Sequence, residues 1–158
     1  MTKKQILALI ISACVFSCAI NQSHRSERAV KLNFSKCIVS SEAFKYLIIQ
    51  MPKGYSKKFI ENEGVCEYRF AFKDGAIAYV SSDVWYGSSL NFENRHSIGH
   101  ESYNKKALLD TIVLKDIQAN NKYWSEQIIG NIMVGYVNAS EDKRALFEKA
   151  FSSIKKFD

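Results

Sequence analysis

The residues best suited to chemistry in this sequence are two histidines four positions apart, His96 and His100, with Glu93 close by. Two imidazoles and a carboxylate can bind Zn²⁺. This spacing brings the histidines to one side only in a helix, and Ser97 and Gly99 disfavour a helix here. Ser97 also stands where the H-E-x-x-H pattern has its glutamate. We therefore expect two exposed loop histidines and neither a metal nor another cofactor. A small metal-dependent hydrolase built on these residues remains the alternative.

Other catalytic patterns are missing from the sequence. Ser88 and Ser89 follow Gly87, but the closing glycine of the G-x-S-x-G nucleophile elbow is absent. The glycine-rich patterns that bind nucleotide phosphates do not occur either. We therefore predict no catalytic residues and a protein that is not an enzyme.

The first eighteen residues have the composition of an export signal. Lys3 and Lys4 give a positive start, residues 6–16 form an apolar run, and Ser17 and Cys18 end it. An apolar run of about eleven residues is too short for a bilayer-spanning helix, which needs about twenty. We expect this segment to be removed or exchanged for another anchor.

The same segment resembles the signal peptide of bacterial lipoproteins, whose lipobox ends in a small residue followed by cysteine. The residues Val15-Phe16-Ser17-Cys18 match it, and Ile11-Ser12-Ala13-Cys14 is a second match that leaves a shorter apolar run. The resemblance implies that Cys18, or alternatively Cys14, becomes a lipidated N-terminus. Several acyl chains hold a protein firmly to a membrane. It also implies a domain outside the cytoplasm in the cell envelope, with the outer membrane favoured over the inner one. Ordinary secretion is the other interpretation.

Two cysteines remain in the folded part of the chain, Cys37 and Cys66. An even pair in an exported protein lies in an oxidising compartment, so we predict a disulfide between them. Closing a loop of about thirty residues contributes about 3 to 4 kcal/mol in the chain-entropy model. The alternative is two separate buried thiols.

The part of the chain beyond the signal is short and mildly basic. Cleavage before Cys18 leaves 141 residues, which suits one domain, and a net charge of +4 from 20 basic and 16 acidic residues. No run of lysine or arginine exceeds two residues, so we expect no nucleic-acid partner. The chain divides into a signal peptide, residues 1–17; a lipidated N-terminus and polar tether, residues 18–31; and a single domain, residues 32–158.

The first half of the domain has the patterns of β-strands. Residues 44–51 form an apolar strand that ends at a Pro/Gly turn, whereas residues 56–62 suit a helical turn or an irregular connection. Residues 65–72 and 77–80 predict a hairpin about Asp74-Gly75. Its inward side chains are Tyr68, Phe70 and Phe72, and its outward ones are Glu67, Arg69 and Lys73.

The second half begins with a predicted short amphipathic helix over residues 104–113. Two strands then flank Gly130-Asn131, a two-residue hairpin connection. Ser140 is a suitable N-cap for a final helix with acidic residues in its first turn. The residues of this helix expected to face inward are Leu146, Phe147, Ala150, Phe151 and Ile154.

These elements predict an α+β domain: an antiparallel sheet of about five to six strands, covered by the C-terminal helix and one shorter helix. It resembles the PsbP/Mog1-like sandwich, a family that includes small envelope lipoproteins. The resembling residues are Met51-Pro52-Lys53-Gly54-Tyr55 at a strand end and residues 141–154 in the last helix. The family has no shared catalytic residues, so the resemblance implies no site.

Residues 81–102 are the least regular part of the domain, and long loops in compact domains often carry function. They contain the residues that we predict for partner binding, which are Trp85, Tyr86, Phe92, His96 and His100. Aromatic side chains commonly anchor protein interfaces. Packing of Trp85 and Phe92 on the sheet as a lid is the alternative.

From these features we predict a membrane-anchored envelope lipoprotein, held by its N-terminal lipid, that binds or scaffolds another envelope protein without catalysis. An immunity lipoprotein that neutralises a toxin is a special case of this class.

Overall fold

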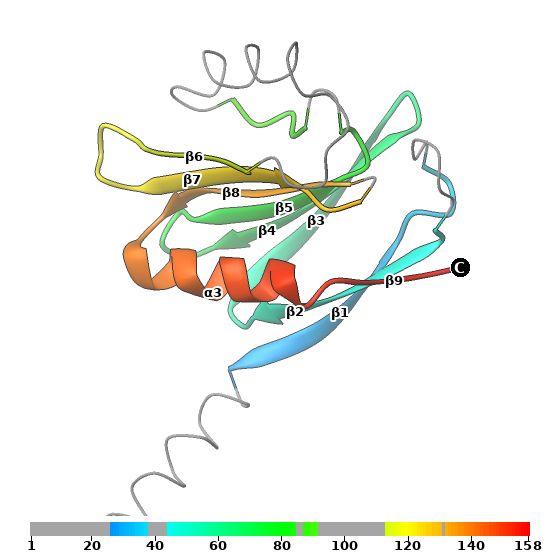
Figure 1. Ribbon diagram of the computed structural model, residues 1–158, viewed down its shortest axis with the longest axis horizontal. Coiled ribbons are helices and arrows are strands. Elements are labelled where there is room, and N and C mark those ends of the chain that lie inside the picture. Colours follow the sequence, from blue (N-terminus) through cyan, green and yellow to red (C-terminus); the bar gives the residue numbers. More distant parts are fainter. Residues whose placement is uncertain (1–25, 38–43, 85–86, 92–112, 131) are drawn as a thin grey trace, which may run out of the picture.

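The computed structural model describes residues 26–37, 44–84, 87–91, 113–130 and 132–158. These residues form two antiparallel sheets and one helix, α3 (Glu141–Ser152), as Figure 1 shows. The small sheet has the order β1-β2-β9, and the large sheet has the order β3-β4-β5-β8-β7-β6. The strands are β1 (Glu27–Asn33), β2 (Tyr46–Pro52), β3 (Tyr55–Asn62), β4 (Val65–Phe72), β5 (Ile77–Ser81), β6 (Val113–Ile117), β7 (Tyr123–Ile128), β8 (Met133–Ala139) and β9 (Lys155–Phe157).

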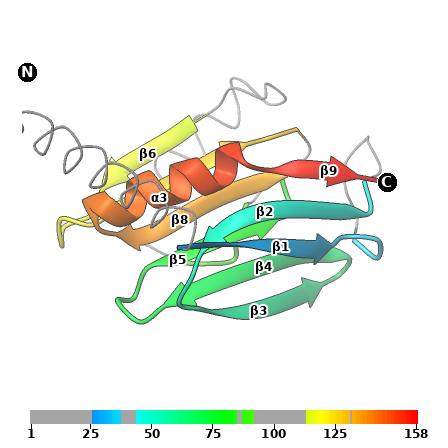
Figure 2. The same ribbon diagram turned by 90° about the horizontal axis from the view of Figure 1, so that it is seen from below.

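The small sheet and α3 lie side by side and together cover one face of the large sheet (Figures 1 and 2). The helix contacts β2 of the small sheet and β7 and β8 of the large one. Between the two layers lies a single apolar core. Its fully buried aromatic side chains include Phe34 from the end of β1, Phe70 from β4 and Phe147 from α3. This face of the large sheet is therefore buried because both the small sheet and the helix pack on it.

The hairpin predicted about Asp74-Gly75 is confirmed, since β4 and β5 pair antiparallel. Gly75 has a φ of +84°, a backbone conformation that glycine adopts without strain. The Asp74 carboxylate accepts a hydrogen bond from the backbone N–H of Ala76 and forms an ion pair with Lys143 of α3. Burial opposes the charged form, but these two contacts outweigh it, so the pKa of Asp74 lies below its usual value.

The predicted hairpin about Gly130-Asn131 and the last helix are also confirmed. Strands β7 and β8 pair antiparallel, and Gly130 has a φ of +56°. The helix follows Ser140, although the hydroxyl of Ser140 makes no capping hydrogen bond. Phe147, Ala150 and Phe151 are buried as expected.

One predicted inward side chain of the helix is wrong. Leu146 is 39 % exposed, because the buried face of α3 is centred on Phe147 and Phe151. The phenol of Tyr136 in β8, whose ring contacts Phe147, donates a hydrogen bond to the exposed side chain of Glu148 at 3.3 Å. Burial, followed by the negative charge of Glu148, raises the pKa of the Tyr136 phenol far above its usual value. The phenol therefore stays protonated and remains a donor.

The fold class is β-richer than the α+β expectation. A three-stranded sheet packs on one face of the six-stranded one, and the described residues contain one helix. Residues 56–62 belong to strand β3 rather than to a helical turn. Residues 113–117 and 155–157 form edge strands β6 and β9 that the sequence patterns did not predict. The expected short helix falls outside the described residues, apart from Val113, which begins β6.

The tether predicted over residues 18–31 ends earlier. Strand β1 begins at Glu27, and Val30 is buried in the core. Buried and exposed side chains do not alternate at the start of β1, because Arg28 and Ala29 are both exposed. The sequence of this stretch therefore lacks the regular alternation that predicts a strand. Of the predicted tether, residues 18–25 lie outside the described part of the chain.

The predicted disulfide is confirmed and joins the two layers. Cys37 follows β1 of the small sheet, Cys66 lies in β4 of the large one, and their Cα atoms are 5.6 Å apart. Beside it, the phenol of Tyr68 donates to the backbone oxygen of Asn33 at 2.8 Å and accepts from its N–H at 3.1 Å. The end of β1 is thus fixed to β4 by a covalent bond and two hydrogen bonds. Disulfides persist in oxidising compartments, so this crosslink is typical of a domain outside the cytoplasm.

Within the described residues, no helix has the length and apolarity needed to cross a membrane.

Reduction of the Cys37–Cys66 disulfide should lower the free energy of unfolding by about 3 to 4 kcal/mol, because the unfolded chain regains the entropy of a 29-residue separation. Denaturant unfolding with and without reductant measures this. The Cys37→Ala/Cys66→Ala variant should lose a similar amount and become insensitive to reductant. Equal midpoints for the oxidised and reduced wild-type chain would contradict the prediction.

Candidate binding face of the large sheet

The five residues predicted for partner binding, Trp85, Tyr86, Phe92, His96 and His100, lie outside the described part of the chain. The structure does describe the chain on either side of Trp85 and Tyr86, over residues 82–84 and 87–91. These residues lie against the face of the large sheet that points away from the small sheet and α3. The outer face therefore holds described residues on both sides of Trp85 and Tyr86.

Strand alternation selects the side chains of the outer face. Because Tyr68, Phe70 and Phe72 of β4 point into the core, Glu67 and Arg69 point to the outer face. Arg69 pairs with Tyr79 of β5, Tyr79 pairs with Gly135 of β8, and Gly135 pairs with Glu126 of β7. One row across four strands thus carries a cation, a phenol, a glycine and a carboxylate.

Glu67 is the centre of a buried polar cluster. It is only 4 % exposed, and the nearest charge is the guanidinium of Arg69, whose Nε donates to Oε1 at 2.5 Å. The hydroxyl of Ser88 donates to the same oxygen at 2.8 Å, and the backbone N–H of Ser89 donates to Oε2 at 3.0 Å. Arg69 in turn donates to the Ser89 hydroxyl at 2.7 Å. Two residues of the sheet therefore hold two consecutive loop residues through side-chain and backbone contacts.

The start of the loop is held to the same strand. Ser82 donates its backbone N–H to the Cys66 carbonyl at 2.8 Å, and its hydroxyl accepts from the Cys66 N–H at 2.9 Å. The N–H of Gly87 donates to the Asp83 carbonyl at 3.0 Å, so the chain on either side of residues 84–86 meets at one hydrogen bond. The chain before Trp85 is therefore attached to the sheet at Cys66, and the chain after Tyr86 is attached at Glu67.

A second carboxylate on this face binds the phenol of Tyr79. The Tyr79 hydroxyl donates to Glu126 at 2.5 Å, and both side chains are buried. The tyrosine reaches across β8 at Gly135, where an added Cβ would lie 2.3 Å from the Tyr79 oxygen and 2.6 Å from the Ser125 carbonyl. Any side chain at position 135 would collide with the phenol, so this glycine is required by close approach rather than by backbone conformation.

The two buried carboxylates of this face, Glu67 and Glu126, are both hydrogen-bonded to other side chains. The Glu67 carboxylate accepts three hydrogen bonds, so both of its oxygens are engaged by Arg69, Ser88 and Ser89. Among the described residues, no group of three histidine, cysteine or carboxylate side chains is arranged to bind a metal ion. The described contacts of this face attach Ser82, Ser88 and Ser89 to strand β4.

The sequence patterns missed this cluster. Glu67 and Arg69 were predicted to point outward, and the structure buries the first and half-buries the second on that side. The period of two placed both on the outer face correctly, but it could not show that residues 87–90 cover them. The second buried carboxylate gave no sequence signal either, because Glu126 stands between the polar residues Ser125 and Gln127 in strand β7.

No protein-family model, curated protein or solved structure matches this chain.

Replacing Glu67 with alanine should release the loop from the sheet and destabilise the domain by about 3 kcal/mol, because a buried ion pair and two further hydrogen bonds lose their acceptor. Amide hydrogen exchange provides the local measurement. The Ser89 N–H should exchange at least about tenfold faster, because a decrease of about 1.4 kcal/mol in the free energy of opening already increases the exchange rate tenfold.

The matched control is Glu61→Ala, which removes an exposed glutamate from the neighbouring strand β3. It should leave both the stability and the exchange rate of Ser89 nearly unchanged. If Glu67→Ala and Glu61→Ala behaved alike, Glu67 would not be the residue that holds the loop.

Proposed function

We propose that this protein is a lipid-anchored module of the cell envelope that binds another envelope protein through the loop of residues 81–102. The observation that carries the proposal is the fixed base of that loop. Ser82 is bonded to Cys66, and Ser88 and Ser89 are bonded to Glu67. A loop whose two ends are hydrogen-bonded to a sheet loses less conformational entropy on binding than a loop with free ends. More of the free energy of its contacts therefore appears as affinity.

The composition of the loop supports recognition of a protein. Trp85, Tyr86 and Phe92 are the residue types most enriched at the centres of protein interfaces. The loop also holds His96 and His100, which can donate or accept hydrogen bonds around such a centre. The aromatic residues provide apolar contact area, and the polar residues fix orientation.

The anchor rests on the N-terminal sequence. Residues 6–16 and the Val15-Phe16-Ser17-Cys18 match favour lipidation at Cys18, and the Cys37–Cys66 crosslink is consistent with an oxidising compartment. Strand β1 begins nine positions after Cys18, at Glu27. Nine residues span at most about 30 Å when fully extended, so a lipidated Cys18 would keep the domain close to its membrane.

Replacing Cys18 with alanine should abolish membrane association, because the chain would lose the sulfur that carries the lipid. The intact mass of the purified protein and its flotation with the membrane fraction measure this. Cys14→Ala is the matched control and should leave the lipidated mass unchanged, since cleavage before Cys18 removes position 14. Loss of lipid with Cys14→Ala alone would instead assign the anchor to Cys14. A wild-type chain of unprocessed mass in the cytosol would refute the anchor.

Replacing Trp85 with alanine should weaken the partner contact without unfolding the domain, because its neighbours Ser82 and Ser88 keep their bonds to the sheet. Crosslinking in intact cells followed by mass spectrometry should show the main crosslinked adduct reduced about tenfold or more, as expected for an interface anchor.

The control for the loop is Phe59→Ala, which removes an aromatic side chain that is 44 % exposed on edge strand β3, away from the loop. It should leave the adduct intact. An adduct that survives Trp85→Ala but is lost with Phe59→Ala would place the partner on the β3 edge and refute the assignment to the loop.

A further inference from the structure

The outer surface of the small sheet combines lysines with apolar and aromatic side chains. Because Val30, Leu32, Leu47 and Ile49 point into the core, the alternate residues of β1 and β2 point outward. The pairing of the strands aligns them in two rows. One row is Lys31, Ile48 and Lys155, and the other is Asn33, Tyr46 and Phe157.

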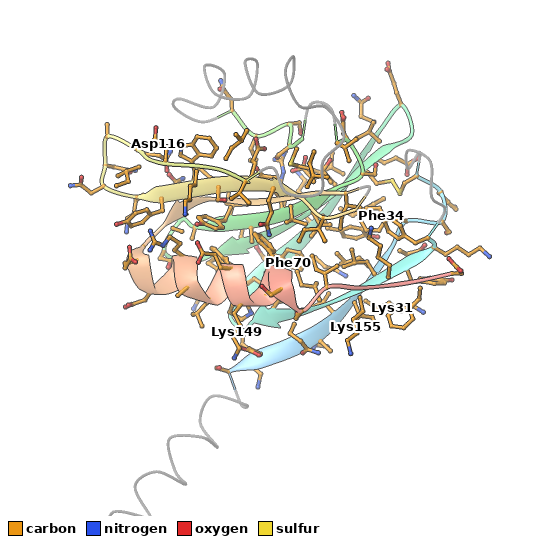
Figure 3. All side chains as sticks on the ribbon, viewed as in Figure 1. Lys31, Phe34, Phe70, Asp116, Lys149 and Lys155 are labelled. Carbon is orange, nitrogen blue, oxygen red and sulfur yellow. A yellow bond between two sulfur atoms is a disulfide. The ribbon has the colours of Figure 1, made fainter. Side chains whose placement is uncertain are left out.

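The charges of this surface are predominantly positive. The three strands of the small sheet carry four basic side chains, Arg28, Lys31, Lys155 and Lys156, and one acidic side chain, Glu27. Glu27 is paired with Lys149 of α3 at 2.7 Å. Lys156 faces the inner side, 5.2 Å above the ring of Phe44. Lys31 and Lys155 thus form the positive centre of the outer surface, where Figure 3 shows both on the side away from Phe70.

Apolar groups lie beside these cations. Phe157 is 46 % exposed, and the Lys31 amine lies 3.6 Å from the centre of the Tyr46 ring. Ile48 lies between the two lysines in the register of the sheet. Asp158 follows Phe157 and adds one negative charge beyond the aromatic row. Lysines around a few aromatic and aliphatic side chains are the composition that binds an anionic lipid surface.

The position of this surface in the chain adds a geometric argument. The first described strand, β1, contributes Lys31, and it begins at Glu27 only nine positions after Cys18. A lipidated Cys18 would therefore hold the small sheet within about 30 Å of the bilayer. By contrast, Lys57 and Lys58 lie on β3 at the edge of the other sheet.

We infer that the outer surface of the small sheet, centred on Lys31, Lys155 and Phe157, rests on anionic phospholipid headgroups of the membrane that carries the lipid anchor. This inference rests on the proposed anchoring and adds an orientation to it. The lysines contact phosphate groups, and Phe157 enters the interfacial region. The predicted binding loop belongs to the large sheet, on the face that the small sheet does not cover, so it would remain available to a partner.

Hydroxyl-radical footprinting of the full lipidated protein in vesicles tests the inference, because the chain provides a matched pair of aromatic residues. Phe157 is 46 % exposed on the small sheet, and Phe59 is 44 % exposed on β3. In vesicles of phosphatidylcholine mixed with phosphatidylglycerol, Phe157 should be oxidised at least about fivefold more slowly than in phosphatidylcholine alone. That factor corresponds to the contribution of one lysine near an anionic surface. Phe59 should be oxidised equally in both, and high salt should remove the protection of Phe157.

Two variants of equal charge assign the effect to the lysines. Lys31→Gln/Lys155→Gln should abolish the protection of Phe157, and Lys57→Gln/Lys58→Gln should preserve it. Equal oxidation of Phe157 in both lipid mixtures, or equal protection of Phe59, would overturn the inference.

The same samples separate this inference from the proposed anchoring. Protein that floats with the vesicles and has the lipidated mass, but leaves Phe157 unprotected, refutes the orientation alone. Protein that lacks the lipid refutes both.

Discussion

The attachment of the small sheet to the large one is the constraint on which the rest of the structure depends. The two sheets share no strand, so they are held by packing, by the Cys37–Cys66 crosslink and by the phenol of Tyr68 on the backbone of Asn33. Phe34 lies beside these contacts, with its ring 5.3 Å from that of Tyr68. Without this junction, Leu32, Leu47 and Ile49 would lose the surface that buries them.

The same strand that receives the crosslink also supports the loop. Cys66 faces the core and Glu67 faces the outer surface, so adjacent residues of β4 serve the two sides of the large sheet. Ser82 bonds to the backbone of Cys66, which places the start of the loop beside the crosslink. Residues Cys66 and Glu67 thus connect the packed core to the outer face. The side chains of Glu67 and Arg69 then hold Ser88 and Ser89.

How far the sequence predicts this protein depends on whether the information is local. The β4–β5 and β7–β8 hairpins, the final helix and the disulfide partners follow from turn residues, periodicity and an even cysteine count. The second sheet does not, because a three-residue strand such as β9 has no measurable period and exists only because β2 offers it an edge. Strand β3 was missed for a related reason: as an exposed edge it carries Lys57 and Lys58 rather than an apolar alternation.

The candidate site could be proposed from the sequence as a segment, but the contacts that attach its ends to the sheet could not. The irregular composition of residues 81–102 indicated a loop, but its support comes from Glu67 and Arg69 of a strand some twenty residues earlier in the sequence. Gly135 shows the same limit. A glycine within a strand indicates close approach of another group. The sequence does not identify that group as the Tyr79 phenol, which crosses Gly135 and donates a hydrogen bond to Glu126.

The strand order sets when this chain can fold. Strand β8 lies in the middle of the large sheet, between β5 and β7, and β9 completes the small sheet at the opposite end of the sequence from β1. A chain that emerges N-terminus first can therefore complete the large sheet only after Ala139 and the small sheet only after Phe157, so both sheets depend on contacts between residues distant in the sequence.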